Sequence, residues 1–137
     1  MRLSGNTVLI TGGTSGIGFE LARRLMASGN EVIVTGQSQA HLDTAKHQLP
    51  GIHAVASDVS DPAAIANLYR DIVGQFPGLN MLVNNAGIMR KIDLQAVDPD
   101  LQDVTREVEI TLNGAIRMTV QFLPQLERQP RAAIVNV

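Results

Sequence analysis

Cysteine is absent from this sequence of 137 residues, and aromatic residues make up only 3% of it. The lack of cysteine excludes disulfide bonds, thiol catalysis and thiolate metal sites. It is typical of a reducing compartment, so we expect a cytoplasmic location. The three histidines, His41, His47 and His53, have no acidic partners at the spacing of a metal site or a catalytic triad, so no metal is predicted.

An excess of basic charge is lacking as well. Eleven basic residues stand against thirteen acidic ones, giving a formal net charge of −2, and the arginines are scattered. No basic stripe is therefore available for a nucleic acid or an anionic membrane, and neither partner is predicted. No apolar run approaches the length of a membrane span. With 45% hydrophobic residues, the chain is expected to form one globular domain with an ordinary core.

Short apolar runs alternate with amphipathic segments along the chain. The runs predict strands at 7–11, 31–35, 52–56, 81–84 and 133–137, and the segments predict helices at 16–28, 39–49, 62–76 and 99–128. Continuous hydrophobicity in strands that are each followed by a helix favours a parallel sheet covered on both faces. We therefore predict an α/β fold with a Rossmann-type doubly wound sheet. Because the last apolar run ends the sequence, we expect residues 1–137 to be a domain that is incomplete after its fifth strand.

The segment 99–128 is the longest of the predicted helices, and Asp98-Pro99 is expected to open it. Apolar residues recur along it at steps of three or four, which predicts one continuous stripe: Leu101, Val104, Val108, Leu112, Ala115, Met118, Phe122 and Leu126. Such a stripe packs on its own sheet or offers part of its surface to a second subunit. We predict a homo-oligomer that forms through this helix.

A glycine-rich turn lies between the first strand and the first helix. At such a turn the first N–H groups of the helix lack internal partners and the helix dipole adds positive charge, so an anion such as a pyrophosphate is stabilised. Gly12 permits a sharp turn, Gly16 permits close approach of backbone to phosphate, and Gly18 permits close packing of the helix on the sheet. Thr14 and Ser15 add hydroxyl donors beside Ile17. The alternative is a tight turn that binds nothing.

Three motifs in register resemble the short-chain dehydrogenase/reductase family: Thr11-Gly12-x-x-x-Gly16-Ile17-Gly18, Asp58-Val59 and Asn84-Asn85-Ala86-Gly87. Residues 6–20 and 107–126 look similar to the bacterial DltE-like branch of that family. The resemblance covers the whole chain, which corresponds to about the first half of the family's domain. It implies a Rossmann fold and hydride transfer between a nicotinamide cofactor and a small carbonyl or alcohol substrate.

The resemblance also assigns roles to individual residues. Asp58 would accept a hydrogen bond from the adenine amino group, and the Val59 backbone would meet the ring. A helix cap is the alternative for Asp58, and Ser60 and Asp61 compete for that role. The cofactor ribose would be lined by Asn85, Ala86 and Gly87, whereas the Asn84 amide would tie neighbouring strands together.

The end of the second strand bears on the choice of cofactor. NAD-binding proteins place an acidic residue there for the ribose hydroxyls, but this sequence has Gly36. Gln37, at the position where NADP-dependent members of the family often carry Arg, and Ser38 can bond a phosphate. The sequence therefore favours NADP, with NAD as the alternative.

The catalytic groups that the resemblance requires are not found in this sequence. The one tyrosine, Tyr69, is followed four residues later by Val73 instead of a lysine, and the family's serine would fall just after Val137. Thr111 occupies the position of the family's asparagine. We therefore expect the chain to be the inactive cofactor-binding half of an oxidoreductase. The alternatives are a non-catalytic dinucleotide-binding module and an interaction module that pairs through its long helix.

Overall fold

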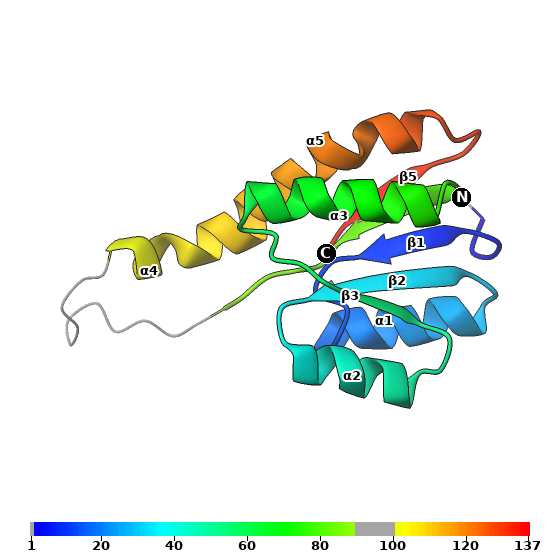
Figure 1. Ribbon diagram of the computed structural model, residues 1–137, viewed down its shortest axis with the longest axis horizontal. Helices are drawn as coiled ribbons and strands as arrows, with labels where there is room; N and C mark the ends of the chain where they lie inside the picture. The colour runs from blue at the N-terminus through cyan, green and yellow to red at the C-terminus, as the bar shows by residue number, and fades with distance from the viewer. Residues whose placement is uncertain (1, 90–100) are drawn as a thin grey trace.

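A single parallel sheet of five strands forms the centre of the molecule (Figure 1). The computed structural model describes residues 2–89 and 101–137. The strands are β1 (Thr7–Ile10), β2 (Glu31–Gly36), β3 (His53–Ala56), β4 (Leu79–Asn84) and β5 (Ala133–Asn136). They are arranged in the order β3-β2-β1-β4-β5, so the direction of winding reverses between β1 and β4. The predicted doubly wound α/β fold is confirmed.

Helices cover both faces of this sheet (Figure 1). The helices α1 (Gly16–Ala27) and α2 (Gln39–Gln48) lie on one face, and α3 (Pro62–Gln75) and α5 (Gly114–Glu127) lie on the other. Side chains of β1 alternate between the two layers: Val8 and Ile10 belong to the core under α1, and Leu9 belongs to the core under α3 and α5. All three are fully buried, which explains why the strand reads as one uninterrupted apolar run.

The third helix begins at Pro62, the first residue of the predicted range. Asp61 is the N-cap of α3 and accepts a hydrogen bond of 2.9 Å from the N–H of Ala63, with Pro62 at the first helical position. The helix α2 is capped in a similar way by Ser38, whose hydroxyl accepts from the N–H of His41. Both helices therefore satisfy part of their N-terminal N–H groups with their own side chains.

The long helix is interrupted, contrary to the prediction. It consists of α4 (Leu101–Glu107), a π-helix η1 (Val108–Asn113) and α5, and the N–H of Gly114 bonds to the carbonyl of Glu109, five residues earlier. The expectation of one continuous α-helix over 99–128 is wrong in this middle part. The predicted start at Asp98-Pro99 lies outside the described residues.

The π-helix changes which side chains reach the core. Met118, Phe122 and Leu126 are buried as predicted, but Val108 and Leu112 are 50% and 56% exposed. Of the two alternatives for the stripe, packing on the sheet therefore does not apply to these two residues, which lie in the π-helix. The side chains of residues 101 and 104 lie outside the described set. Within residues 2–89 and 101–137, no helix is long and apolar enough to cross a lipid bilayer.

Phe122 anchors α5 to the sheet and to α3. It is fully buried, and its ring meets that of Tyr69 edge-on with centroids 5.2 Å apart. We expect Phe122→Ala to lower the free energy of unfolding by about 3–5 kcal/mol because it removes a large side chain from a packed core. The exposed Leu3 provides the control, and Leu3→Ala should cost less than about 0.5 kcal/mol in urea denaturation. Equal losses for the two variants would contradict this assignment of the core.

Candidate functional site

A cavity of about 400 Å³ opens at the carboxyl ends of the strands, where the strand order reverses. This is the place where open α/β sheets bind ligands. Its walls come from the loops after β1, β2, β3 and β4 and from η1, and its lining residues are Gly12, Thr14, Ser15, Gly16, Ile17, Thr35, Gly36, Gln37, Ser57, Val59, Asn85, Ala86, Gly87, Ile88 and Ile110.

Most of the residues proposed from the sequence lie on these walls. Of the predicted cofactor residues, Gly18 and Asp58 do not line the cavity, although Ile17 does, as do Ser57 and Val59 on either side of Asp58. Thr111 is not a lining residue either, but its hydroxyl lies beside Gly87, where an added Cβ would come within 3.2 Å of the Thr111 Oγ1. Four lining residues were not proposed from the sequence: Thr35, Ser57, Ile88 and Ile110. Ser57 directly precedes the Asp58-Val59 motif, whereas nothing in the sequence marks Ile110 as a cavity residue.

The glycine turn has the backbone geometry that its glycines allow. Gly12 and Gly16 have φ angles of +63° and +56°, in the left-handed region that other residues rarely adopt. Gly18 is needed for a different reason, because a Cβ there would lie 2.4 Å from the side-chain nitrogen of Asn85 and 2.6 Å from the carbonyl oxygen of Gly12. A Cβ at Gly16 would meet no atom within 4 Å, so this glycine leaves open space at the cavity wall.

The N-terminus of α1 faces the cavity without a side-chain cap in the described part of the chain. Its N-cap, Ser15, makes no capping hydrogen bond, and the first turn contains no acidic residue. The N-termini of α2 and α3 are capped by Ser38 and Asp61. The α1 N-terminus therefore keeps the donors and the positive end of the helix dipole that attract an anion.

Hydrogen bonds tie the loop after β1 to the loop after β4. The Thr11 hydroxyl oxygen accepts from the N–H groups of Asn85 and Ala86, each at 3.0 Å. In return, the Asn85 side-chain nitrogen donates to the carbonyls of Thr11 and Gly12, each at 3.1 Å. Asn85 thus lines the cavity and at the same time holds the glycine turn in place.

Neighbouring Asn84 ties strands together, as expected. Its side-chain nitrogen donates to the Asn136 side-chain oxygen on β5 at 2.9 Å and to the Thr119 hydroxyl on α5 at 3.1 Å. The amide therefore joins β4 to its neighbour strand and to the helix above it.

The end of β2 is crowded by the glycine turn. A Cβ at Gly36 would lie 2.7 Å from the Thr14 hydroxyl oxygen and 2.8 Å from its methyl carbon. Any side chain at position 36 would therefore force Thr14 to move. Gln37, the next residue, is exposed and lines the cavity, so it is the first side chain of this loop that can reach a ligand.

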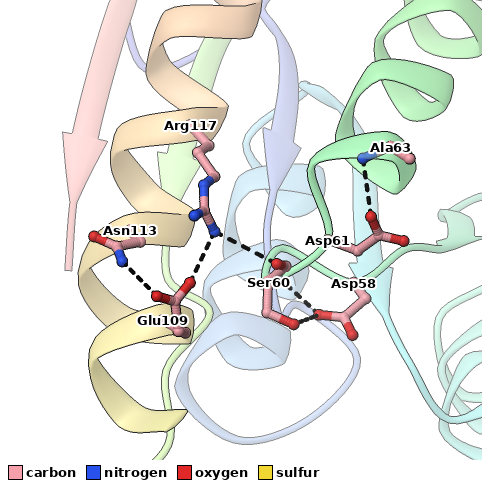
Figure 2. A network of polar contacts seen from close by, with 7 residues as sticks. All are labelled: Asp58, Ser60, Asp61, Ala63, Glu109, Asn113 and Arg117. Atoms are coloured by element: carbon pink, nitrogen blue, oxygen red, sulfur yellow. Dashed lines mark hydrogen bonds and ion pairs between the residues drawn. The ribbon is translucent and has the colours of Figure 1, made fainter. Parts of the chain in front are cut away.

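The turn after β3 is organised by Asp58, which is not the helix cap (Figure 2). One carboxylate oxygen of Asp58 accepts from the N–H of Ser60 at 2.8 Å and from its hydroxyl at 2.7 Å. Asp61 provides the cap of α3 instead. Val59, between them, is 5% exposed and lines the cavity.

A charged pair on the helical side contacts this turn (Figure 2). Arg117 on α5 lies 3.0 Å from the carboxylate of Glu109 on η1, which also accepts a hydrogen bond from Asn113 at 2.8 Å. The hydrogen bond from Arg117, followed by that from Asn113, lowers the pKa of Glu109 below its ordinary value. Because folding lowers this pKa, the pair stabilises the folded chain at neutral pH, and that contribution is lost as the pH falls through the lowered pKa.

Tyr69 has a packing role. Its ring contacts Phe122, and its hydroxyl accepts a hydrogen bond from Arg128 at 3.5 Å. It is not among the residues that line the cavity. Across residues 2–89 and 101–137, no group of three or more His, Cys, Asp or Glu side chains is placed to hold a metal ion.

Comparison with known proteins agrees with this architecture. Residues 6–137 match the family described as short chain dehydrogenase. The chain is 46% identical to the oxidoreductase DltE of Bacillus subtilis (strain 168) over 137 residues, covering all of this chain and 54% of DltE. It is 31% identical over 131 residues to the NADP-dependent 3-hydroxy acid dehydrogenase YdfG of Salmonella typhi, covering 95% of this chain and 52% of YdfG.

A solved structure gives the same result. The crystal structure of a short-chain dehydrogenase from Streptomyces avermitilis matches with a TM-score of 0.84 and 28% identity, covering 97% of this chain and 49% of that one. The chain spans about half the length of the curated relatives it matches. The resemblance to DltE noted from the sequence is confirmed, and the family match over residues 6–137 shows that this chain belongs to the short-chain dehydrogenase family.

Proposed function

We propose that this chain is the cofactor-binding half of an NAD(P)-dependent oxidoreductase that acts on a small carbonyl or alcohol. The observation that carries the proposal is the N-terminus of α1, which opens on the cavity without a side-chain cap beside the glycine turn. Backbone N–H groups at such a helix end bind the pyrophosphate of a dinucleotide. The whole protein's activity is inferred from the family, because the chain spans about half the length of its relatives.

The residues on the cavity walls fit such a cofactor. Gly16 leaves its Cβ position empty at the wall, and the buried hydroxyl of Ser57 has no hydrogen-bond partner within the described residues. The proposed site uses the glycine turn for the pyrophosphate, Asp58 and Val59 for the adenine, and Asn85, Ala86 and Gly87 for the ribose. A bound nicotinamide cofactor supplies hydride exchange with a carbonyl or alcohol carbon.

The residues of this chain bind and orient and do not donate the catalytic proton. Thr111 remains the candidate at the position of the family's asparagine, and its hydroxyl lies beside Gly87. We propose that the proton-transfer groups come from another part of the whole protein and that this chain is inactive alone. A cytoplasmic location stays a prediction that rests on the absence of cysteine.

Gly16→Leu tests the glycine turn directly. It fills the space at the cavity wall and strains a residue with a φ angle of +56°. The matched control is Gly5→Leu, since Gly5 has a φ angle of +72° and open space around it but does not line this cavity. Both variants should lose about 1–2 kcal/mol of unfolding free energy. Calorimetric titration should show loss of NADPH binding for Gly16→Leu alone, and unchanged binding by that variant would refute the proposed site.

We propose NADP as the preferred cofactor. An acidic side chain that would repel a 2′-phosphate is lacking at Gly36, and a side chain there would force Thr14 to move. Gln37 is an exposed polar residue that lines the cavity, and the next residue, Ser38, is exposed as well. YdfG, to which this chain is 31% identical, is named as NADP-dependent, and this supports NADP as the cofactor of this chain.

Gln37→Glu tests the cofactor preference. A carboxylate beside a 2′-phosphate should weaken NADPH binding about fivefold or more through charge repulsion, whereas NADH binding should stay unchanged. The dissociation constants of both cofactors, measured by fluorescence titration at low salt, give the result. Tighter binding of NADH than NADPH by the unmodified chain would overturn the preference.

We also propose that two copies of the chain associate through the helix that begins at α4. Val108, Leu112, Ile116, Val120 and Leu123 recur at steps of three or four residues along η1 and α5, with exposed fractions between 42% and 67%. A contiguous apolar surface of this kind is typical of an interface. Two such stripes can face each other across a twofold axis, since each copy offers the same surface.

The double variant Ile116→Glu/Val120→Glu should convert a dimer into a monomer, because it places charges in the centre of the apolar stripe. Light scattering coupled to gel filtration measures the mass in solution. Gln48→Glu, on the exposed side of α2, is the control for added negative charge and should leave the dimer intact. A double variant with the same mass as the dimer would contradict this interface.

A further inference from the structure

Arg117 bridges two elements that are far apart in the sequence (Figure 2). Its Nη1 atom donates to a carboxylate oxygen of Glu109 at 3.0 Å and to the backbone carbonyl of Ser60 at 3.4 Å. The second oxygen of Glu109 accepts from Asn113 at 2.8 Å. The guanidinium is thus anchored on the helical side and reaches across to the turn after β3.

Within the described residues, Ser57 at the start of this turn donates its N–H to the Gly36 carbonyl on β2 at 3.0 Å, whereas the hydrogen bonds of residues 58–61, apart from that to Arg117, stay within the turn and α3. Asp58 bonds to Ser60 within the turn, the N–H of Asp61 bonds to the Asp58 carbonyl at 3.1 Å, and Asp61 bonds forward to Ala63. All these contacts are local. The Ser60 carbonyl, in contrast, points out of the turn toward Arg117 (Figure 2).

A second contact lies one residue away from the first. Val59 packs against Gly114, where an added Cβ would lie 2.8 Å from a Val59 methyl carbon and 3.2 Å from its carbonyl oxygen. The turn is therefore pressed against the start of α5 at Val59 and held there by Arg117 at Ser60. Both Val59 and Ile110, one residue from Glu109, line the cavity, so this bridge sets how two of its walls lie relative to each other.

We propose that Arg117, held by Glu109, is a positioning residue for the adenine end of the cofactor site. This inference rests on the proposed function, since it assumes that Asp58 and Val59 meet an adenine ring. Arg117 itself does not line the cavity. It acts through the Ser60 carbonyl by fixing the turn that carries both residues, and it has no role at the nicotinamide end.

The test separates the two ends of the cofactor. Binding of 5′-AMP and of nicotinamide mononucleotide to the chain is measured by NMR titration for the unmodified protein and for Arg117→Met. Loss of a charged hydrogen bond that orders the turn should weaken 5′-AMP binding about tenfold and leave nicotinamide mononucleotide binding unchanged. Arg117→Lys should recover part of the loss, because a single nitrogen makes both contacts of Arg117.

Arg23→Met is the matched control. Arg23 pairs with Glu20 at 2.7 Å on the exposed surface of α1 and does not line the cavity, so binding of both fragments should be unchanged. Glu109→Gln provides a second variant that keeps the side-chain shape and removes the charge. It should weaken 5′-AMP binding in the same selective way, and it tests the bridge even if Arg117→Met unfolds in circular dichroism.

The outcomes distinguish this inference from the function on which it rests. Equal weakening of both fragments, or unchanged 5′-AMP binding in folded Arg117→Met and Glu109→Gln, would overturn the positioning role alone. If the unmodified chain bound neither 5′-AMP nor NADPH, the proposed function would fall and this inference with it.

Discussion

The hydrogen bonds between Thr11 and the loop after β4 are the constraint on which the cavity depends. They place two loops side by side whose residues are 74 and 75 positions apart in the sequence. The parallel pairing of β1 with β4, with Ile10 opposite Val83, brings the ends of these strands to the same level. Thr11 then fixes the distance between the loops, and Gly18 leaves room for the Asn85 side chain that binds back to the glycine turn.

The parts of this arrangement that follow from local signals could be predicted from the sequence. The uninterrupted apolar strands indicated a sheet buried on both faces, and the glycine pattern after the first strand indicated a sharp turn with close packing of the helix on the sheet. The hydrogen-bonding role of Thr11 could not be predicted, because its partners belong to another motif and only the sheet brings them together. Ile110 could not be predicted either, because only the folded chain brings the π-helix η1 to the cavity wall.

The π-helix is the feature that the spacing of apolar residues did not predict. Apolar residues at steps of three and four are compatible with an α-helix throughout, yet one wider turn at 108–113 moves Val108 and Leu112 away from the core. The same turn is followed by Gly114, whose missing side chain lets α5 approach Val59 closely. A departure from regular helix geometry thus accompanies both the exposed apolar stripe and the contact with the turn after β3.

The two helical layers contribute to the cavity by different means. The layer that contains α1 offers mainly backbone: the uncapped N–H groups of α1 and glycines that add no side chain at the cavity wall. The turn before α3 and the π-helix η1 before α5 offer side chains, Val59 and Ile110, whose positions depend on packing and on a charged pair across the turn. Backbone groups impose a residue type only where a Cβ would collide or a φ angle is positive, so they leave a recognisable motif. Packed side chains can be exchanged for others of similar volume and leave no such motif. The glycine turn could therefore be predicted from the sequence, whereas the positions of Val59 and Ile110 become clear only in the folded structure.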